Sequence, residues 1–149
     1  MPHGKWENFK DKPKYVAKKL IGRTIEPEGL VAEIIETEPY KSGNQTERRH
    51  CMMLAPGQIG IMPHRGLSFI NIATEEAGIP SCVLIRAVRI DDVIYDGPGK
   101  VGKILNARNL EYKIMGKDIP IRGQTKPSTF YAPKDKADNS QGRYRLKGI

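Results

Sequence analysis

The sequence predicts an α+β fold: a single domain built on a curved, mostly antiparallel β-sheet (a partial barrel) with a few short flanking helices. Many short apolar or alternating segments are separated by Gly, Pro and polar residues, which is typical of antiparallel strands. Few stretches have helical spacing. A chain of 149 residues suits one compact domain. We therefore expect one domain over residues 1–149, with residues 1–12 as a loosely held arm.

The first predicted element is a short helix over the sequence PKYVAKKLIG. Pro13 suits the first turn of a helix, where its missing N–H is not needed. Tyr15, Val16, Ala17 and Leu20 follow at helical spacing, which indicates one apolar stripe. Gly22 is expected to end the helix.

A hairpin is predicted next, formed by 24–25 and 30–38 around a Pro-Glu-Gly turn. In the second strand, alternation places Glu36 and Glu38 on the same face as the apolar Ala32 and Ile34. A carboxylate at the end of a core strand can activate water in a hydrolytic enzyme. The alternative is a strand that simply enters solvent with both acids hydrated.

A second hairpin is predicted from 59–62 and 67–72, with Gly66 in the turn PHRG. Residues 81–90 form a further strand, in which Arg86 lies on an otherwise apolar face. A buried arginine is costly unless it is paired with an acid. The expected partner is Glu38 or Glu36.

The remaining elements are one helix and three short strands. The helix begins at Asp96-Gly97-Pro98, where Asp96 or Gly97 is expected to cap it. Lys100 and Lys103 near its start suit either an anion or an ordinary solvated surface. The strands are expected at 119–121, 129–131 and 143–146.

Composition narrows the class of protein. Lys and Arg total 25 against 17 acids, a net charge of +8 that favours polyanionic partners such as nucleic acid. Two cysteines, neither in a CxxC pair, do not make a disulfide scaffold or a zinc site. No apolar run is long enough to span a membrane or serve as a signal peptide. We expect a cytoplasmic or nucleoid-associated protein (nuclear in a eukaryote) that is not secreted.

Several motifs occur in one order along the chain: VAKKLIGRTI, IIETEPY, QTERRHCMMLAPG, FINIA, CVLIRAV, DGPGKVGKIL and GRYRLKG. Together they resemble the alkyladenine (3-methyladenine, or alkylpurine) DNA glycosylase family, from about Val16 to Lys147. The resemblance implies an enzyme that flips a damaged purine, such as hypoxanthine or 3-methyladenine, out of duplex DNA. It then hydrolyses the N-glycosidic bond, without a lyase step, a metal or another cofactor.

The resemblance also assigns roles to individual residues. Glu38 matches the general base, and Arg86 matches the arginine that helps to hold the attacking water. Tyr40 matches an aromatic that stacks on the flipped base, and Asn71 matches the asparagine that discriminates against the guanine amino group. A backbone carbonyl near Tyr131 is expected to complete the water site.

The chain departs from the family pattern in its DNA-facing parts. Arg65 stands where the family inserts a tyrosine into the duplex, and Met62 replaces the second pocket aromatic. The loop after Tyr40 is short and lacks the family's base-contacting histidine, and a helix-bearing region is missing between Arg86 and Asp96. A more open and less selective pocket is therefore expected.

The expected partner is double-stranded DNA containing damaged purines, bound by a monomer. The candidate DNA contacts are His64, Arg65, Arg48, Arg49, Lys100 and Lys103. The alternative function is a non-catalytic nucleic-acid-binding relative whose pocket has degenerated.

Overall fold

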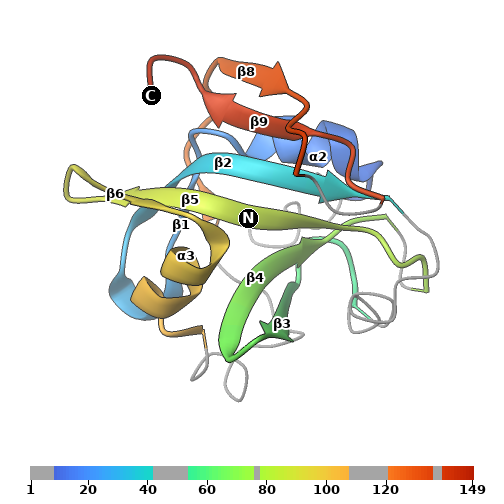
Figure 1. Ribbon diagram of the computed structural model, residues 1–149, viewed down its shortest axis with the longest axis horizontal. Helices are drawn as coiled ribbons and strands as arrows, with labels where there is room; N and C mark the ends of the chain where they lie inside the picture. Colours follow the sequence, from blue (N-terminus) through green and yellow to red (C-terminus); the bar gives the residue numbers. More distant parts are fainter. Residues whose placement is uncertain (1–8, 42–53, 76–77, 108–120, 136–138) are drawn as a thin grey trace.

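A computed structural model describes residues 9–41, 54–75, 78–107, 121–135 and 139–149 (Figure 1). Two α-helices, one 3-10 helix and nine strands are described. The helices are α2 (Pro13–Leu20), α3 (Pro98–Ile104) and the 3-10 helix η1 (Pro27–Gly29). The strands are β1 (Thr24–Ile25), β2 (Ala32–Tyr40), β3 (Ile59–His64), β4 (Leu67–Ala73), β5 (Cys82–Ile90), β6 (Val93–Asp96), β7 (Ile121–Arg122), β8 (Ser128–Tyr131) and β9 (Arg143–Leu146).

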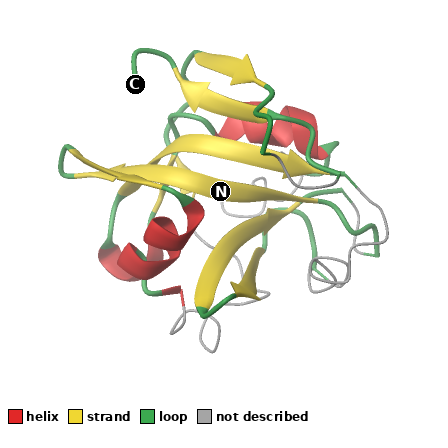
Figure 2. Ribbon diagram, viewed as in Figure 1, coloured by secondary structure: helices red, strands yellow, loops and turns green. Residues whose placement is uncertain are grey.

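The strands form one sheet with the order β3-β4-β5-β2-β1-β7. β6 pairs with β5, β9 pairs with β2, and β8 pairs with β9. Every described pair is antiparallel. β2 and β5 therefore lie in the middle of the sheet (Figure 2), which does not close into a barrel. The predicted α+β class is confirmed.

The first helix forms where the sequence predicts it. Val16, Ala17 and Leu20 of α2 are buried in the main hydrophobic core. Tyr15 is 57% exposed, so its expected place in the apolar stripe is wrong. The reason is geometric, because adjacent residues are about 100° apart around a helix and Tyr15 falls outside the face that packs on the sheet. Phe9, just before the helix, is buried in the same core.

The first predicted hairpin is confirmed, with η1 as its connection. Its second strand, β2, is not regular. The register against β5 shifts on both sides of Glu36, which marks a β-bulge or similar irregularity. Such an irregularity re-aims side chains locally. Simple alternation along β5 predicts that Val88 shares the face of Arg86. In the structure Val88 lies opposite Ile34, next to the irregularity, and packs in the main core instead.

The second hairpin is also confirmed, but its turn is tighter than the sequence suggests. β3 continues through Pro63 to His64, so the tip consists of Arg65 and Gly66 alone. Both have positive φ, 49° and 81°, as a two-residue type I′ turn requires. Gly66 adopts positive φ without steric cost, whereas positive φ at Arg65 carries a steric cost because Arg65 has a Cβ.

A strand that the sequence analysis missed, β6, follows β5 directly. Asp91 and Asp92 connect the two strands, again with positive φ values of 49° and 66°. This tight hairpin accounts for the short segment between Arg86 and Asp96. The following helix, α3, is capped by Gly97 without a side-chain hydrogen bond.

The end of the chain contributes β7, β8 and β9. The strand expected at 129–131 is confirmed as β8 and that at 143–146 as β9. The strand expected at 119–121 is described only from Ile121, because 108–120 lie outside the described residues. No helix in the described parts of the chain is long and apolar enough to cross a membrane.

Candidate active site

The two central strands bring Glu38 and Arg86 together. Arg86 Nη1 donates to Glu38 Oε1 at 3.1 Å, and Arg86 Nε donates to Glu36 Oε2 at 3.1 Å. Arg86 therefore forks between the two acids of the ETEPY motif. The pairing predicted from the cost of a lone buried arginine is confirmed, and both predicted partners take part.

Glu38 accepts three further hydrogen bonds. Tyr40 Oη donates to Oε1 at 2.8 Å, while Ser140 Oγ and Arg143 Nε donate to Oε2 at 2.8 and 3.1 Å. A carboxylate offers about four lone-pair positions. All of them are occupied, and Glu38 is only 1% exposed.

Glu36 is held by a second set of donors. Besides Arg86, it accepts from Tyr131 Oη at 2.9 Å and from Arg145 Nη1 at 2.7 Å. Arg145 Nη2 continues to Asp96 Oδ2 at 3.0 Å on β6. Charges of alternating sign thus run from an exposed aspartate on β6 through Arg145, Glu36 and Arg86 to Glu38. We call these five residues the charge chain.

The carboxylates change the ionisation of their partners. Burial disfavours the charge of Arg145, but its hydrogen bonds to Glu36 and Asp96 outweigh burial and raise its pKa. Burial likewise opposes the charge of Arg143, whose pKa is nevertheless raised by contact with Tyr131 and Glu38. Burial, reinforced by Glu36 and opposed by Arg143, raises the pKa of the Tyr131 hydroxyl. These arginines are therefore fixed positive charges.

Strand register places other predicted residues on the face of Glu38. Leu84 of β5 is directly opposite Glu38 on one side and Asn71 of β4 on the other. Directly opposite residues in adjacent strands project to the same face. Tyr40 lies two residues beyond Glu38, and Met62 of β3 is opposite Phe69, two residues before Asn71. Alternation therefore puts Tyr40 and Met62 on this face as well.

Asn71 is completely buried, with a relative exposure of 0%. Its Oδ1 accepts from the Cys82 thiol at 3.5 Å, whereas its Nδ2 has no hydrogen-bond partner within the described part of the chain. A buried polar atom without a partner carries a free-energy cost, which a bound ligand can relieve.

The remaining predicted residues comprise four exposed basic side chains, two residues that the structure does not describe, and one neighbour of Glu36. His64 and Arg65 are exposed at the β3–β4 tip, and the His64 ring lies 5.1 Å from that of Phe69. Lys100 and Lys103 are exposed on α3. Arg48 and Arg49 fall outside the described residues. Tyr131 of β8 contacts Glu36 through its side-chain hydroxyl.

Three contacts of the site were missed from the sequence: Ser140, Arg143 and Arg145. A signal was present for the two arginines, because they alternate around the buried Tyr144 in a predicted strand. Period-2 spacing places both on one face, where two positive charges need acidic partners. Ser140 sits in a polar loop and had no such signal.

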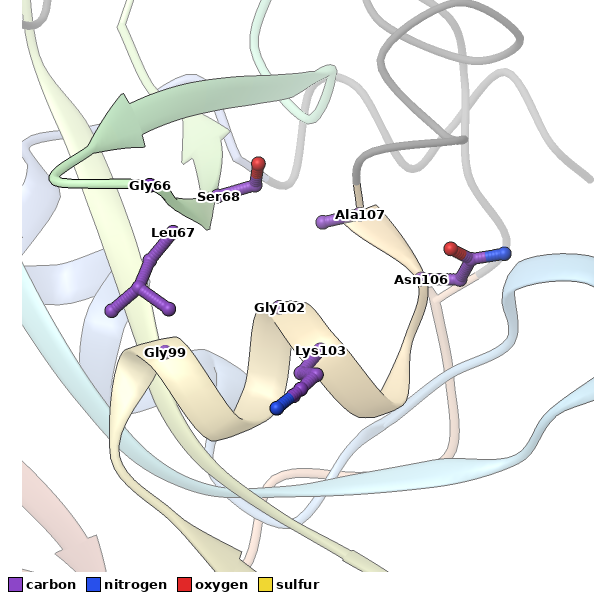
Figure 3. Close-up of a pocket in the computed structure, with 8 residues that line it drawn as sticks. All are labelled: Gly66, Leu67, Ser68, Gly99, Gly102, Lys103, Asn106 and Ala107. Carbon is purple, nitrogen blue, oxygen red and sulfur yellow. The ribbon is translucent and has the colours of Figure 1, made fainter.

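A separate hollow lies between the β3–β4 hairpin and α3 (Figure 3). Its lining includes Leu67 and Ser68 from β4, and Gly102, Lys103 and Asn106 from α3 and the residues after it. It contains no member of the charge chain. Within the described ranges, no group of three or more His, Cys, Asp or Glu side chains is placed to hold a metal ion.

Comparison with known proteins identifies relatives along most of the chain. The family model for methylpurine-DNA glycosylase matches residues 7–131. A Lactiplantibacillus plantarum protein named "Putative 3-methyladenine DNA glycosylase" is 29% identical, covering 77% of this chain and 64% of its own. A Synechococcus elongatus protein of the same name is 32% identical, over 68% of this chain and 59% of its own. A third, from Rhodopseudomonas palustris strain HaA2, is 32% identical over 89% and 81%.

The chain thus spans less than two thirds of the length of the first two relatives and most of the third. The family match includes β2 and β5, which carry Glu38 and Arg86, and ends at Tyr131, before β9. Family model and relatives agree with each other and with the order of motifs along the sequence. The chain belongs to the methylpurine-DNA glycosylase family.

Proposed function

We propose that this protein is a DNA glycosylase that removes alkylated or deaminated purines from duplex DNA. Glu38 acts as the general base toward water, and Arg86 holds both Glu38 and that water. The observation that carries the proposal is the 3.1 Å contact between Glu38 and Arg86 in a member of this family. Tyr40 and Asn71 on the same face support it.

The residue types suit N-glycosidic hydrolysis. An alkylated purine is a good leaving group, and positive charge develops on the sugar as the bond breaks. A carboxylate beside that carbon both accepts the proton of water and stabilises the charge. General-base assistance of this kind is worth about 10²–10⁴-fold in rate.

Water needs a free position on Glu38. Arg86 is held a second time by Glu36, and Arg143 by Asp135, so neither charged guanidinium is easily displaced. The donors that can yield are therefore the hydroxyls of Tyr40 and Ser140. We propose that binding of the damaged nucleotide displaces one of these hydroxyls and admits the water.

The flipped base would lie across Leu84 toward Asn71. Two strand spacings, about 9–10 Å, separate the backbones of β2 and β4. This distance suits a nucleotide whose sugar carbon lies beside Glu38 and whose base edge meets Asn71 Nδ2, which has no hydrogen-bond partner among the described residues. Flipping costs on the order of a few kcal/mol and stacking on an aromatic such as Tyr40 returns about 1–3 kcal/mol.

Positive charge would supply most of the affinity for the duplex. The chain carries a net charge of +8, and its β3–β4 tip exposes His64 and Arg65. Contacts from Lys and Arg to phosphate make binding steeply dependent on salt. We propose that the protein acts as a monomer in the compartment that holds the DNA and does not cleave the sugar–phosphate backbone.

Base release from defined duplexes tests the proposal. Single-turnover assays with hypoxanthine, ethenoadenine or 3-methyladenine at one position would compare the wild type with Glu38→Gln. The wild type should release at least one base, and Glu38→Gln should reduce its rate about 10²–10⁴-fold. Affinity for a duplex with an abasic-site analogue should stay within a factor of about two.

A second candidate function is favoured by one observation. Glu38 is 1% exposed and its lone-pair positions are filled, as in a structural ion pair. A non-catalytic relative that binds nucleic acid would show this arrangement permanently. It would bind duplex DNA in a salt-dependent way and release no base from any of the three substrates.

A further inference from the structure

Glu36, the first acid of the ETEPY motif, does not take part in the chemical step proposed above, yet it is buried and fully engaged. Glu36 is 4% exposed and accepts hydrogen bonds from Arg86, Tyr131 and Arg145. Three strands, β5, β8 and β9, each supply one donor to this buried acid. The contact with Arg86 connects Glu36 to Glu38, and the other two contacts hold Glu36 in place.

Arg86 reaches Glu38 through one nitrogen and Glu36 through another. A guanidinium is a rigid planar fork, so a partner at one nitrogen fixes the direction of the others. Without Glu36, Arg86 would be restrained only by the single contact to Glu38. Its half-buried side chain would then be free to leave that contact.

Glu36 is in turn held from the other side. Tyr131 and Arg145 reach it from β8 and β9, and Arg145 is tied to Asp96 on β6. β8 and β9 are far from β5 in sequence, although β6 follows β5 directly. The hydrogen bonds from Tyr131 and Arg145 therefore hold Glu36 separately from the one made by Arg86.

We propose that Glu36 is a positioning residue, which aims the Arg86 guanidinium at Glu38 and at the water that Glu38 activates. The proposal deepens the proposed function and rests on it for its effect on rate. Glu36 itself does not touch the substrate.

The test is a double-variant cycle with Glu36→Gln and Arg86→Met in the single-turnover assay. Glu36→Gln should slow base release about 10- to 100-fold. This is the range seen in metalloenzymes when a residue that orients a metal ligand is removed, which is a comparable positioning role. Affinity for the abasic-site duplex should not change. In the Arg86→Met background, Glu36→Gln should have no further effect, because its target is gone.

A matched control lies on the same two strands. Glu33 of β2 pairs with Arg89 of β5, outside the candidate site. Glu33→Gln removes an equivalent charge and should leave the rate unchanged. Equal losses in Glu33→Gln and Glu36→Gln, or additive effects of Glu36→Gln and Arg86→Met, would overturn the positioning role.

The Arg86 Nε–H signal in ¹⁵N NMR provides a readout that does not depend on activity. It is assigned by its loss in Arg86→Met. In the wild type it should be protected from solvent exchange, and in Glu36→Gln it should broaden or exchange at least tenfold faster. An unchanged signal refutes the ordering of Arg86 by Glu36, whereas a wild type that releases no base refutes the proposed function instead.

Discussion

The contact between Arg143 and Glu38 gives the sharpest prediction about stability. Both side chains are buried, at 9% and 1% exposure, and their hydrogen bond measures 3.1 Å. Removing the sole partner of a buried charge costs about 3–5 kcal/mol. Here Glu38 keeps Arg86 on its other oxygen, so Arg143→Met should cost about one buried charged hydrogen bond, about 1.5–3 kcal/mol, besides the weaker contacts of Arg143 with Tyr131 and the exposed Asp135.

Urea unfolding at neutral pH measures this loss, and Arg122→Met provides the comparison. Arg122 is 66% exposed and pairs with Glu26 at 3.4 Å, so its loss should cost about 0–1 kcal/mol. In a Glu38→Gln background, the cost of Arg143→Met should fall, because its charged partner is absent. The reasoning is refuted if Arg143→Met is no more costly than Arg122→Met, or if its cost is the same in both backgrounds.

Two further predictions concern other parts of the fold. A Cβ at Gly102 would lie 1.8 Å from the backbone carbonyl oxygen of Ser68 in β4. Gly102→Ala should therefore destabilise the protein by about 1–3 kcal/mol in thermal unfolding. Lys103 is exposed on the same helix, so Lys103→Ala should change the stability little. Partial burial raises the pKa of Glu33, but Lys126 and Arg89 outweigh it and lower that pKa. Its stabilisation is thus present above the unfolded pKa of about 4.3 and lost as pH falls through the folded value. In urea unfolding, Glu33→Gln should therefore lower the free energy of unfolding at pH 7, and this cost should shrink as the pH falls below about 4.3. A cost that does not change with pH would contradict this.

Much of the fold was predictable because local patterns and tertiary packing agree. Residues 82–90 are rich in apolar and β-branched side chains and are bounded by turn residues, and they form β5 as expected. Tyr15 and β6 were not predicted correctly. The exposure of Tyr15 depends on which helix face packs on the sheet, and β6 depends on a turn in which two aspartates adopt positive φ.

The contacts between Arg86 and the two glutamates were predictable from the sequence, whereas the contacts of Glu38 with Ser140 and Arg143 were not. The cost of burying Arg86 without a partner predicts a contact with Glu36 or Glu38 from the sequence alone, and both contacts are present. Ser140 and Arg143 come from a segment about 100 residues further along the chain. No local pattern encodes that proximity, which arises only when β9 pairs with β2.

The central claim is that Glu38 activates a water molecule held with Arg86 next to the sugar of a damaged nucleotide. A crystal structure of the wild type bound to a duplex with a non-hydrolysable analogue of the lesion tests this claim most directly. The account predicts a flipped nucleotide and an ordered water within hydrogen-bond distance of Glu38 and of Arg86, with the hydroxyl of Tyr40 or Ser140 displaced. A bound duplex with its lesion still stacked, and all four donors still on Glu38, would contradict it.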